Sequence, residues 1–328
     1  MTDPSRLFLP DQRTPRPSGE FVLYWMQATQ RADWNPALEY AISHANEQRV
    51  PLLVYHGLRH DYPWASDRLH TFILEGVVDL YAGFAARGIQ YAFYLDPRQG
   101  EGASWPAGNA AASRVPRGTT ERSASPLVQL ADGAALVVTD FNPTFIFPRQ
   151  LRALRRKTAT PVIAVDSCGV VPLQAVGKEH STARGIRPVL MAALPHHLWP
   201  IAPGEPMVQR VVELPFEPTV PTSASIPSLV AGCDIDHAVP PSRSFRGGTG
   251  AARARLAEFL RTGLARYADQ RNDPNEPDAT SRLSPWLHFG HISVQEVLLA
   301  AREAGPDAPY QKFLDETLTW RELAHNFC

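Results

Sequence analysis

Short apolar runs alternate with helical patterns over the first half of the chain, and this alternation constrains the fold more than any other feature. Apolar runs of strand length occur at residues 21–25, 51–55, 89–95, 135–139 and 161–165. Helical patterns between them occur at residues 35–45, 67–87 and 148–157. Strands separated by helices in this way imply a parallel sheet covered on both faces. We therefore expect an α/β fold with a doubly wound, Rossmann-like sheet and right-handed crossovers.

Several residues mark where helices begin and end. Asn35 is a good N-cap and Pro36 suits the first helical position. Gly88 follows the second helical pattern, where a C-cap glycine is expected. Ser293 and Glu296 have the spacing of a capping box, which we interpret as helix initiation only.

The segment after the first strand excludes one large class of nucleotide-binding proteins. Met26–Arg31 contains no glycine, whereas a dehydrogenase-type turn needs glycines for close approach to a pyrophosphate. The chain also has no HExxH, GxSxG or P-loop motif. Cys168, Cys233 and Cys328 have neither metal-ligand spacing nor the pattern of a disulfide framework. We predict no metal site, and no motif identifies catalytic residues.

Net charge leaves nucleic-acid binding open. The formal net charge is −1, which argues against a generally basic surface but not against a local basic groove. One helical stretch, residues 148–157, carries five basic side chains and no acid. It is compatible with phosphate contacts, although a solvated helix face is the interpretation we favour.

The chain shows no sign of a membrane protein. Its N-terminus lacks the apolar core of a signal peptide, and no segment resembles the run of about 20 apolar residues that spans a bilayer. We expect a soluble, cytoplasmic protein.

Proline- and glycine-rich stretches suggest the domain organisation. Residues 97–126 are rich in Gly, Ala, Ser and Pro, which is typical of a flexible surface insertion. A proline-rich region follows residue 195, and a helical pattern resumes at residues 253–267. We predict an α/β domain at residues 1–195, a linker at 196–250 and a helical domain at 251–328.

A candidate anion site lies near residue 284. Ser284 is expected to cap a helix that begins with Pro285. The hydroxyls of Ser281 and Ser284 and the guanidinium of Arg282 lie beside that helix start, where free N–H groups favour phosphate. The alternative is an ordinary capped helix without a ligand.

Glu316 and Trp320 form a second candidate site. They lie four residues apart and are expected to share one helix face. A carboxylate beside an indole is suited to hold and stack a planar base. The alternative is a partly buried aromatic side chain with a solvated acid nearby.

Taken together and in order, several segments resemble class II DNA photolyases. They are YWMQATQR (24–31), FILEGVVDL (72–80), VVTDF (137–141), VDSCGVVPL (165–173), ARGIRPVL (183–190), RNDP (271–274), LSPWLHFGHIS (283–293) and RELAHNFC (321–328). The most specific are LSPWLHFGHIS and RELAHNFC. The resemblance extends over nearly the whole chain.

This resemblance implies a fold, a reaction and cofactors. Photolyases have an N-terminal α/β antenna domain and a C-terminal all-helical domain that binds FAD. The implied reaction is light-driven repair of cyclobutane pyrimidine dimers in UV-damaged DNA, by electron transfer from reduced FAD. The damaged pair is flipped out of the duplex to reach the flavin. The resemblance also raises the question of an antenna chromophore, for which three answers stay open: a deazaflavin, a folate or no chromophore.

The resemblance assigns roles to particular residues. Tyr267, Ser281, Arg282, Leu283 and Ser284 match positions that hold the FAD phosphates and ribitol. For substrate binding, the carboxylate of Glu316 matches the one that hydrogen-bonds the dimer. Trp320 stands where the class II pattern more often has arginine, and it is expected to lie against the flavin or the substrate.

The chain departs from the family by ending early in the helical domain, which leaves the expected flavin site incomplete. Three interpretations follow. The first is a photolyase whose chain is a fragment or is completed by another chain, and the second is an inactive, truncated remnant. The third is a cryptochrome-like flavin photosensor that repairs no DNA. Flavin content and light-dependent loss of dimers discriminate among them.

Overall fold

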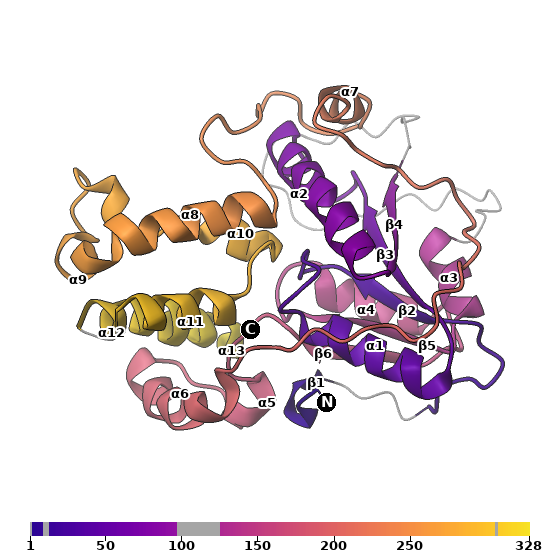
Figure 1. The fold of residues 1–328 in the computed structure, drawn as a ribbon, viewed down its shortest axis with the longest axis horizontal. Coiled ribbons are helices and arrows are strands. Elements are labelled where there is room, and N and C mark those ends of the chain that lie inside the picture. Colours follow the sequence, from indigo (N-terminus) through magenta and orange to yellow (C-terminus); the bar gives the residue numbers. More distant parts are fainter. Residues whose placement is uncertain (1, 9–12, 97–124, 306–307) are drawn as a thin grey trace.

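The fold consists of an α/β part and a helical part that pack side by side (Figure 1). The computed structural model describes residues 2–8, 13–96, 125–305 and 308–328. Residues 97–124, which make up nearly all of the predicted surface insertion, lie outside the described residues, so that prediction is untested.

A mixed sheet forms the centre of the α/β part. Its strands are β1 (Leu7–Phe8), β2 (Val22–Met26), β3 (Leu52–Leu58), β4 (Gln90–Leu95), β5 (Leu136–Phe141) and β6 (Val162–Asp166). The strand order is β1-β6-β5-β2-β3-β4, and β2 to β6 are parallel. All five predicted strands are therefore confirmed, with boundaries shifted by one to three residues. No sequence pattern indicated β1, a two-residue edge strand antiparallel to β6.

Helices cover both faces of this sheet, so the doubly wound arrangement is confirmed. The four that pack on it are α1 (Pro36–Gln48), α2 (Asp67–Ala86), α3 (Pro126–Gly133) and α4 (Phe147–Arg155). Alternate residues of β2 point to opposite faces: Tyr24 shares a hydrophobic cluster with residues of α1 and α2, and Leu23 with residues of α3 and α4. The predicted cap is also present, since the Asn35 side chain accepts a hydrogen bond from the N–H of Leu38 at 3.1 Å.

The helical part has a hydrophobic core of its own. Its elements are α5 (Leu173–Val176), α6 (Ala183–His197), α8 (Thr249–Thr262), α9 (Tyr267–Gln270), α10 (Ser284–Phe289), α11 (Val294–Ala304), α12 (Ala308–Leu314), a π-helical turn η4 (Asp315–Trp320) and α13 (Arg321–Phe327). Helix α7 (Ile226–Ala231) instead packs on α2, through Ile226 and Val230, in the α/β part. Short 3₁₀ turns are η1 (Pro4–Arg6), η2 (Leu264–Arg266) and η3 (Pro277–Ala279). Ile186 and Leu190 of α6 share this core with Phe259 of α8. The domain boundaries at residues 195 and 250 stay predictions.

Helix α2 is long and apolar enough to cross a membrane by length and composition alone. Leu74, Val77, Leu80 and Phe84 of α2 are buried in the cluster that it forms with α1 and the sheet. Its apolar face therefore has the character of a core helix.

The carboxylate of Asp140, in β5, fixes the loop that follows β2. Asp140 is 2% exposed and accepts hydrogen bonds from the backbone N–H groups of Gln27, Ala28 and Thr29 at 2.9, 2.8 and 3.1 Å. The hydroxyls of Tyr24 and Thr29 donate to its other oxygen. One buried carboxylate thereby satisfies the backbone N–H groups of a turn that lacks the glycines of a nucleotide-binding loop.

Arg31, at the end of that loop, connects the two parts of the molecule. It is 3% exposed and donates to the carbonyls of Gly290, Ser167 and Trp34 at 3.0–3.1 Å. Gly290 has φ +71°, and a Cβ at this position would lie 2.1 Å from the carbonyl oxygen of Ala28. Only glycine fits this approach of the helical part to the loop.

His291 forms a second connection. It is fully buried and stacks on Phe72 of α2, with ring centroids 5.1 Å apart. The N–H of Gly248 donates to its Nδ1 at 2.9 Å, so Nε2 carries the proton and faces Gln30 Oε1 at 3.3 Å. Burial lowers the pKa of His291 to about 3, so the ring stays neutral.

Helix α13 is anchored to the loop after β6. Arg321 donates to the carbonyl of Cys168 at 2.7 Å, and Glu322 Oε1 accepts from the N–H of Val170 at 2.7 Å. Within the described residues Glu322 Oε2 is buried without a hydrogen-bond partner. Burial raises the pKa of the Glu322 carboxyl to about 7.

We predict that Asp140→Ala strongly destabilises the fold. The substitution leaves three buried backbone N–H groups and two hydroxyls without their acceptor, and we expect a loss of about 3–5 kcal/mol in the free energy of unfolding. Urea unfolding followed by circular dichroism measures this change. The control is Asp234→Ala at an exposed position, which is expected to change stability by less than about 0.5 kcal/mol. Equal stability of the two variants would contradict the role of Asp140.

We also predict that Glu322 makes stability depend on pH. The folded state keeps this carboxyl protonated up to about pH 7, whereas the ordinary value for the unfolded chain is 4.5. Its contribution, up to about 3 kcal/mol, is therefore complete below pH 4.5 and is lost as the pH rises through about 7. Glu322→Gln keeps an oxygen for the Val170 N–H and should remove this dependence.

The measurement is the difference in unfolding free energy between wild type and Glu322→Gln at pH values from 4.5 to 8. Glu303→Gln, at an exposed position on α11, is the control and should follow the wild-type profile. A difference that stays constant over this range would refute the assignment to Glu322.

Candidate functional site

Tyr267 lies at the start of α9, inside the helical core. It is 8% exposed, and its ring packs edge-on against Phe259 and Phe313 at centroid distances of 5.9 and 5.2 Å. Burial, and next the charge of Glu316, raise the pKa of Tyr267 to about 12. The hydroxyl therefore stays protonated at neutral pH and is available as a hydrogen-bond donor.

Glu316 lies close to Tyr267 and is held by two cations. Arg271 Nη2 and Lys312 Nζ contact its Oε1 at 3.0 and 2.7 Å. The Arg271 guanidinium also lies 6.0 Å from the centre of the Tyr267 ring. Because both cations contact Oε1, Oε2 is left to accept a hydrogen bond from a bound ligand.

Arg271 and Lys312 were not among the residues that the sequence analysis selected. Each was detectable from helical spacing, since Arg271 follows Tyr267 by four residues and Lys312 precedes Glu316 by four. The missing information was that Arg271, directly after α9, lies beside Glu316 of η4.

The turn that carries Glu316 and Trp320 is π-helical rather than α-helical. Asp315, at its first position, accepts two hydrogen bonds from the guanidinium of Arg187 in α6, at 2.7 and 3.1 Å. This bidentate pair fixes the turn against α6. Trp320, at its last position, leaves 51% of its surface exposed. A π-helical turn inside a longer helix is frequent at functional sites.

The segment Ser281–Ser284 forms a loop held by α8. Arg255 donates to the carbonyls of Thr280 and Ser281, both at 2.9 Å. Arg282 has φ +54°, a conformation that is uncommon for a residue with a side chain. Leu283 is 1% exposed and anchors the loop in the helical core.

The predicted N-cap at Ser284 is wrong. Leu283 already has helical backbone angles, so Ser284 is the first residue of α10 and Pro285 the second, and no side chain caps this helix. The capping box at residue 293 is also only half correct. Ser293 accepts a hydrogen bond from the N–H of Gln295, whereas the Glu296 carboxylate pairs with Arg253 at 2.6 Å instead of returning to the cap.

The polar groups of this loop nevertheless fit a phosphate. Ser284 and Arg282 are exposed and Ser281 is half-buried. The Arg282 guanidinium has a loose, exposed contact with Asp278 at 3.6 Å. Two hydroxyls and a weakly engaged guanidinium on a rigid loop form a suitable donor set for an anionic ligand.

The predicted site residues form two groups. Tyr267 and Glu316 lie together, whereas the loop at 281–284 leads into α10, and Figure 1 shows α9 and α10 at opposite ends of α8. A ligand that contacts both groups must therefore be long. Within the described residues, His, Cys, Asp and Glu form no cluster of three that suits a metal ion.

The basic helix α4 packs on the sheet through Leu151 and Leu154 and exposes Arg149, Arg152 and Arg156. Both interpretations of its charge, phosphate contacts and a solvated face, are compatible with this placement.

Comparisons with known proteins identify relatives over nearly the whole chain. Residues 22–208 match the family model described as DNA photolyase. A deoxyribodipyrimidine photo-lyase of Methanothermobacter thermautotrophicus is 33% identical over 312 residues, which are 94% of this chain and 61% of that protein. A deoxyribodipyrimidine photo-lyase of Potorous tridactylus is 29% identical over 98% of this chain and 56% of that protein. The chain thus spans about three fifths of the length of these relatives.

Solved structures share the fold. A cryptochrome of Synechocystis sp. PCC6803 superposes with a TM-score of 0.62 at 14% identity, covering 96% of this chain and 62% of that one. An archaeal photolyase from Sulfolobus tokodaii, described with two FAD molecules, gives a TM-score of 0.55 at 15% identity, covering 93% of this chain and 58% of that one. At these identities the similarity concerns the fold alone.

Proposed function

Because the chain belongs to the DNA photolyase family, we propose that it serves the light-driven repair of cyclobutane pyrimidine dimers in DNA, with reduced FAD as electron donor. The observation that carries this proposal is the group Tyr267, Arg271 and Glu316, in which a protonated hydroxyl and a clamped carboxylate lie together in the helical part. The similarity to the archaeal photo-lyase extends over 94% of the chain, which supports the same proposal. The class II assignment stays a prediction.

In this proposal FAD is held by Tyr267, Ser281, Arg282, Leu283 and Ser284. The hydroxyls of Ser281 and Ser284 donate hydrogen bonds to phosphate oxygens, and the Arg282 guanidinium neutralises part of their charge. Leu283 keeps the loop in place because it is buried in the helical core. The flavin, when bound and reduced, supplies the electron that light transfers to the dimer. The arrangement of two separated groups suits a ligand as long as FAD.

Glu316 is proposed to contact the damaged DNA. Its Oε2 accepts a hydrogen bond from a donor on the dimer, while Arg271 and Lys312 fix the carboxylate through Oε1. Half-exposed Trp320, four residues along the same turn, offers a flat surface for the flipped bases or the flavin. Flipping a dimer out of the duplex costs less free energy than flipping intact bases, because the damage weakens stacking and pairing.

Three further assignments are part of the proposal. An antenna chromophore, a deazaflavin or a folate, would serve the α/β part, as the family resemblance implies. A completing chain is a further proposed partner, in line with the first of the three interpretations of the sequence. Cytoplasmic location is also proposed, as the sequence analysis expects.

We predict that the purified chain carries flavin and that Arg282→Ala lowers the flavin content. Loss of a charge-assisted contact to phosphate should weaken FAD binding about tenfold or more. The absorbance spectrum of the protein, before and after titration with FAD, gives the content and the affinity. Arg149→Ala, on α4, is the matched control and should bind flavin like the wild type. A soluble chain that binds no FAD would overturn the proposed flavin site.

We further predict that Glu316→Gln slows repair without removing the flavin. A weaker hydrogen bond to the dimer should lower the rate of light-dependent dimer loss about tenfold. The assay compares irradiated DNA in light and in darkness, and Glu303→Gln is the control. Repair that is equally fast in the Glu316 variant would exclude the carboxylate from substrate binding, and flavin binding without any repair would favour a photosensor.

A further inference from the structure

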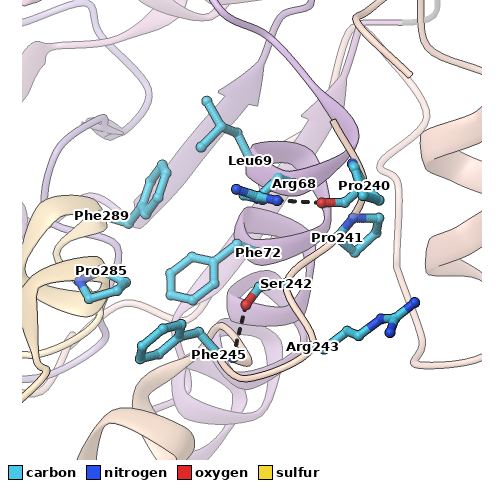
Figure 2. A pocket seen from close by; sticks show the side chains of 10 residues that line it. All are labelled: Arg68, Leu69, Phe72, Pro240, Pro241, Ser242, Arg243, Phe245, Pro285 and Phe289. Carbon is cyan, nitrogen blue, oxygen red and sulfur yellow. Dashed lines mark hydrogen bonds between the residues drawn. The ribbon is translucent and has the colours of Figure 1, made fainter. Parts of the chain in front are cut away.

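A cleft lies between α2, the segment 240–245 and the helix α10 (Figure 2). None of the residues assigned to the flavin lines it, although Pro285 directly follows Ser284. Its volume is about 480 Å³, within the range of roughly 300–1,000 Å³ that is usual for small-molecule sites. The residues that line it are Arg68, Leu69, Phe72, Pro240, Pro241, Ser242, Arg243, Phe245, Pro285 and Phe289.

One side of the cleft is aromatic. Figure 2 shows the rings of Phe72, Phe245 and Phe289 gathered with Pro285. The rings of Phe72 and Phe289 are 5.2 Å apart, and those of Phe72 and Phe245 both contact the buried Trp286 behind them, at 6.1 and 5.6 Å. Phe245 and Phe289 are only partly buried. Flat, partly uncovered rings of this kind suit a planar ligand.

Hydrogen bonds hold the walls of the cleft in place. The backbone N–H and Nε of Arg68 donate to the carbonyls of Val239 and Pro240, at 3.2 and 3.1 Å. The Ser242 hydroxyl accepts from the N–H of Phe245 at 3.0 Å. The Trp286 indole donates to the carbonyl of Arg246 at 2.8 Å, which ties the end of this segment to α10. The cleft is therefore preformed, which lowers the entropic cost of binding.

The charge of the cleft is positive. None of its ten lining residues, all in the described part of the chain, is an acid. In Figure 2 the guanidinium of Arg68 lies between Phe289 and Pro240, on the same side as the phenylalanine rings, whereas the side chain of Arg243 extends away from them. Of the three guanidinium nitrogens of Arg68, only Nε has a hydrogen-bond acceptor within the described residues. The two Nη groups are therefore free to contact an anion.

We propose that this cleft binds a small, planar aromatic molecule that carries a negative charge. The rings of Phe72, Phe245 and Phe289 contact the flat body of the ligand, and the guanidinium of Arg68 contacts its anionic group. The cleft adjoins Pro285, whereas Figure 1 shows α9, which begins with Tyr267, at the other end of α8. The proposal rests on the contacts within the cleft and not on the proposed repair activity.

The test uses two probes of similar shape on the intact chain. 8-Anilinonaphthalene-1-sulfonate is aromatic and anionic, and N-phenyl-1-naphthylamine is its neutral counterpart. Fluorescence titration is expected to show one saturable site for the sulfonate. Arg68→Gln should weaken binding of the sulfonate about tenfold, because it removes a charge-assisted contact, and Arg68→Lys should restore part of it. The affinity for the neutral probe should change less than about twofold in either Arg68 variant.

Two variants test the location of the site. Arg243→Gln removes one charge from the rim without reaching the rings, and should weaken either probe less than about twofold. Leu69→Trp fills the cleft and should weaken both probes about tenfold. Circular dichroism and thermal unfolding verify that each variant is folded.

Three results would overturn the proposal. They are an equal effect of Arg68→Gln and Arg243→Gln, binding of both probes unchanged by Leu69→Trp, and a loss of bound flavin in Leu69→Trp. The third result would mean that the cleft belongs to the flavin site. If the wild type binds no flavin, the proposed function fails, but the two probe titrations still test the cleft.

Discussion

The buried carboxylate of Asp140 is the constraint on which the relation between the two parts of the molecule depends. It accepts hydrogen bonds from three backbone N–H groups of the loop after β2. At the same place a dinucleotide-binding protein has glycines that contact a pyrophosphate. Because the loop is fixed from β5, Arg31 at its end reaches the carbonyls of Gly290 and Ser167. The helical part is thereby placed on the edge of the sheet that the carboxyl ends of β2, β5 and β6 define.

The same connection places both proposed ligand sites. Gly290 and His291, which contact the loop after β2 and α2, directly follow α10. The loop at 281–284 leads into α10, and Pro285 and Phe289 of α10 line the cleft. Figure 1 shows α9, which begins with Tyr267, at the other end of α8. Arg271, directly after α9, pairs with Glu316 of η4, and η4 continues into α13, which Arg321 and Glu322 fix to the α/β part. The helical part is therefore joined to the α/β part both through Gly290 and through α13.

Much of the fold was predictable because its signals are local. Five apolar runs predicted five strands, and Asn35 with Pro36 predicted the start of α1, since periodicity and capping depend on neighbouring residues. Predictions failed where a distant partner decided the outcome. Glu296 does not cap its helix because its carboxylate pairs with Arg253. Ser284 is helical rather than an N-cap, and Arg255 of α8 holds the loop before it.

The sequence by itself determined the layers of the α/β part, the positions of its strands and the segments that resemble photolyases, because each of these is encoded by residues close together in the chain. Only the tertiary structure decided which side chains meet. Arg271, directly after α9, meets Glu316 of η4 only in the folded chain, and the positive, aromatic cleft forms where a proline-rich segment is hydrogen-bonded along α2. The contact between Arg68 and Pro240 joins residues 172 positions apart, and that between Arg31 and Gly290 joins residues 259 positions apart. No local pattern encodes such contacts because they depend on how distant segments pack in three dimensions.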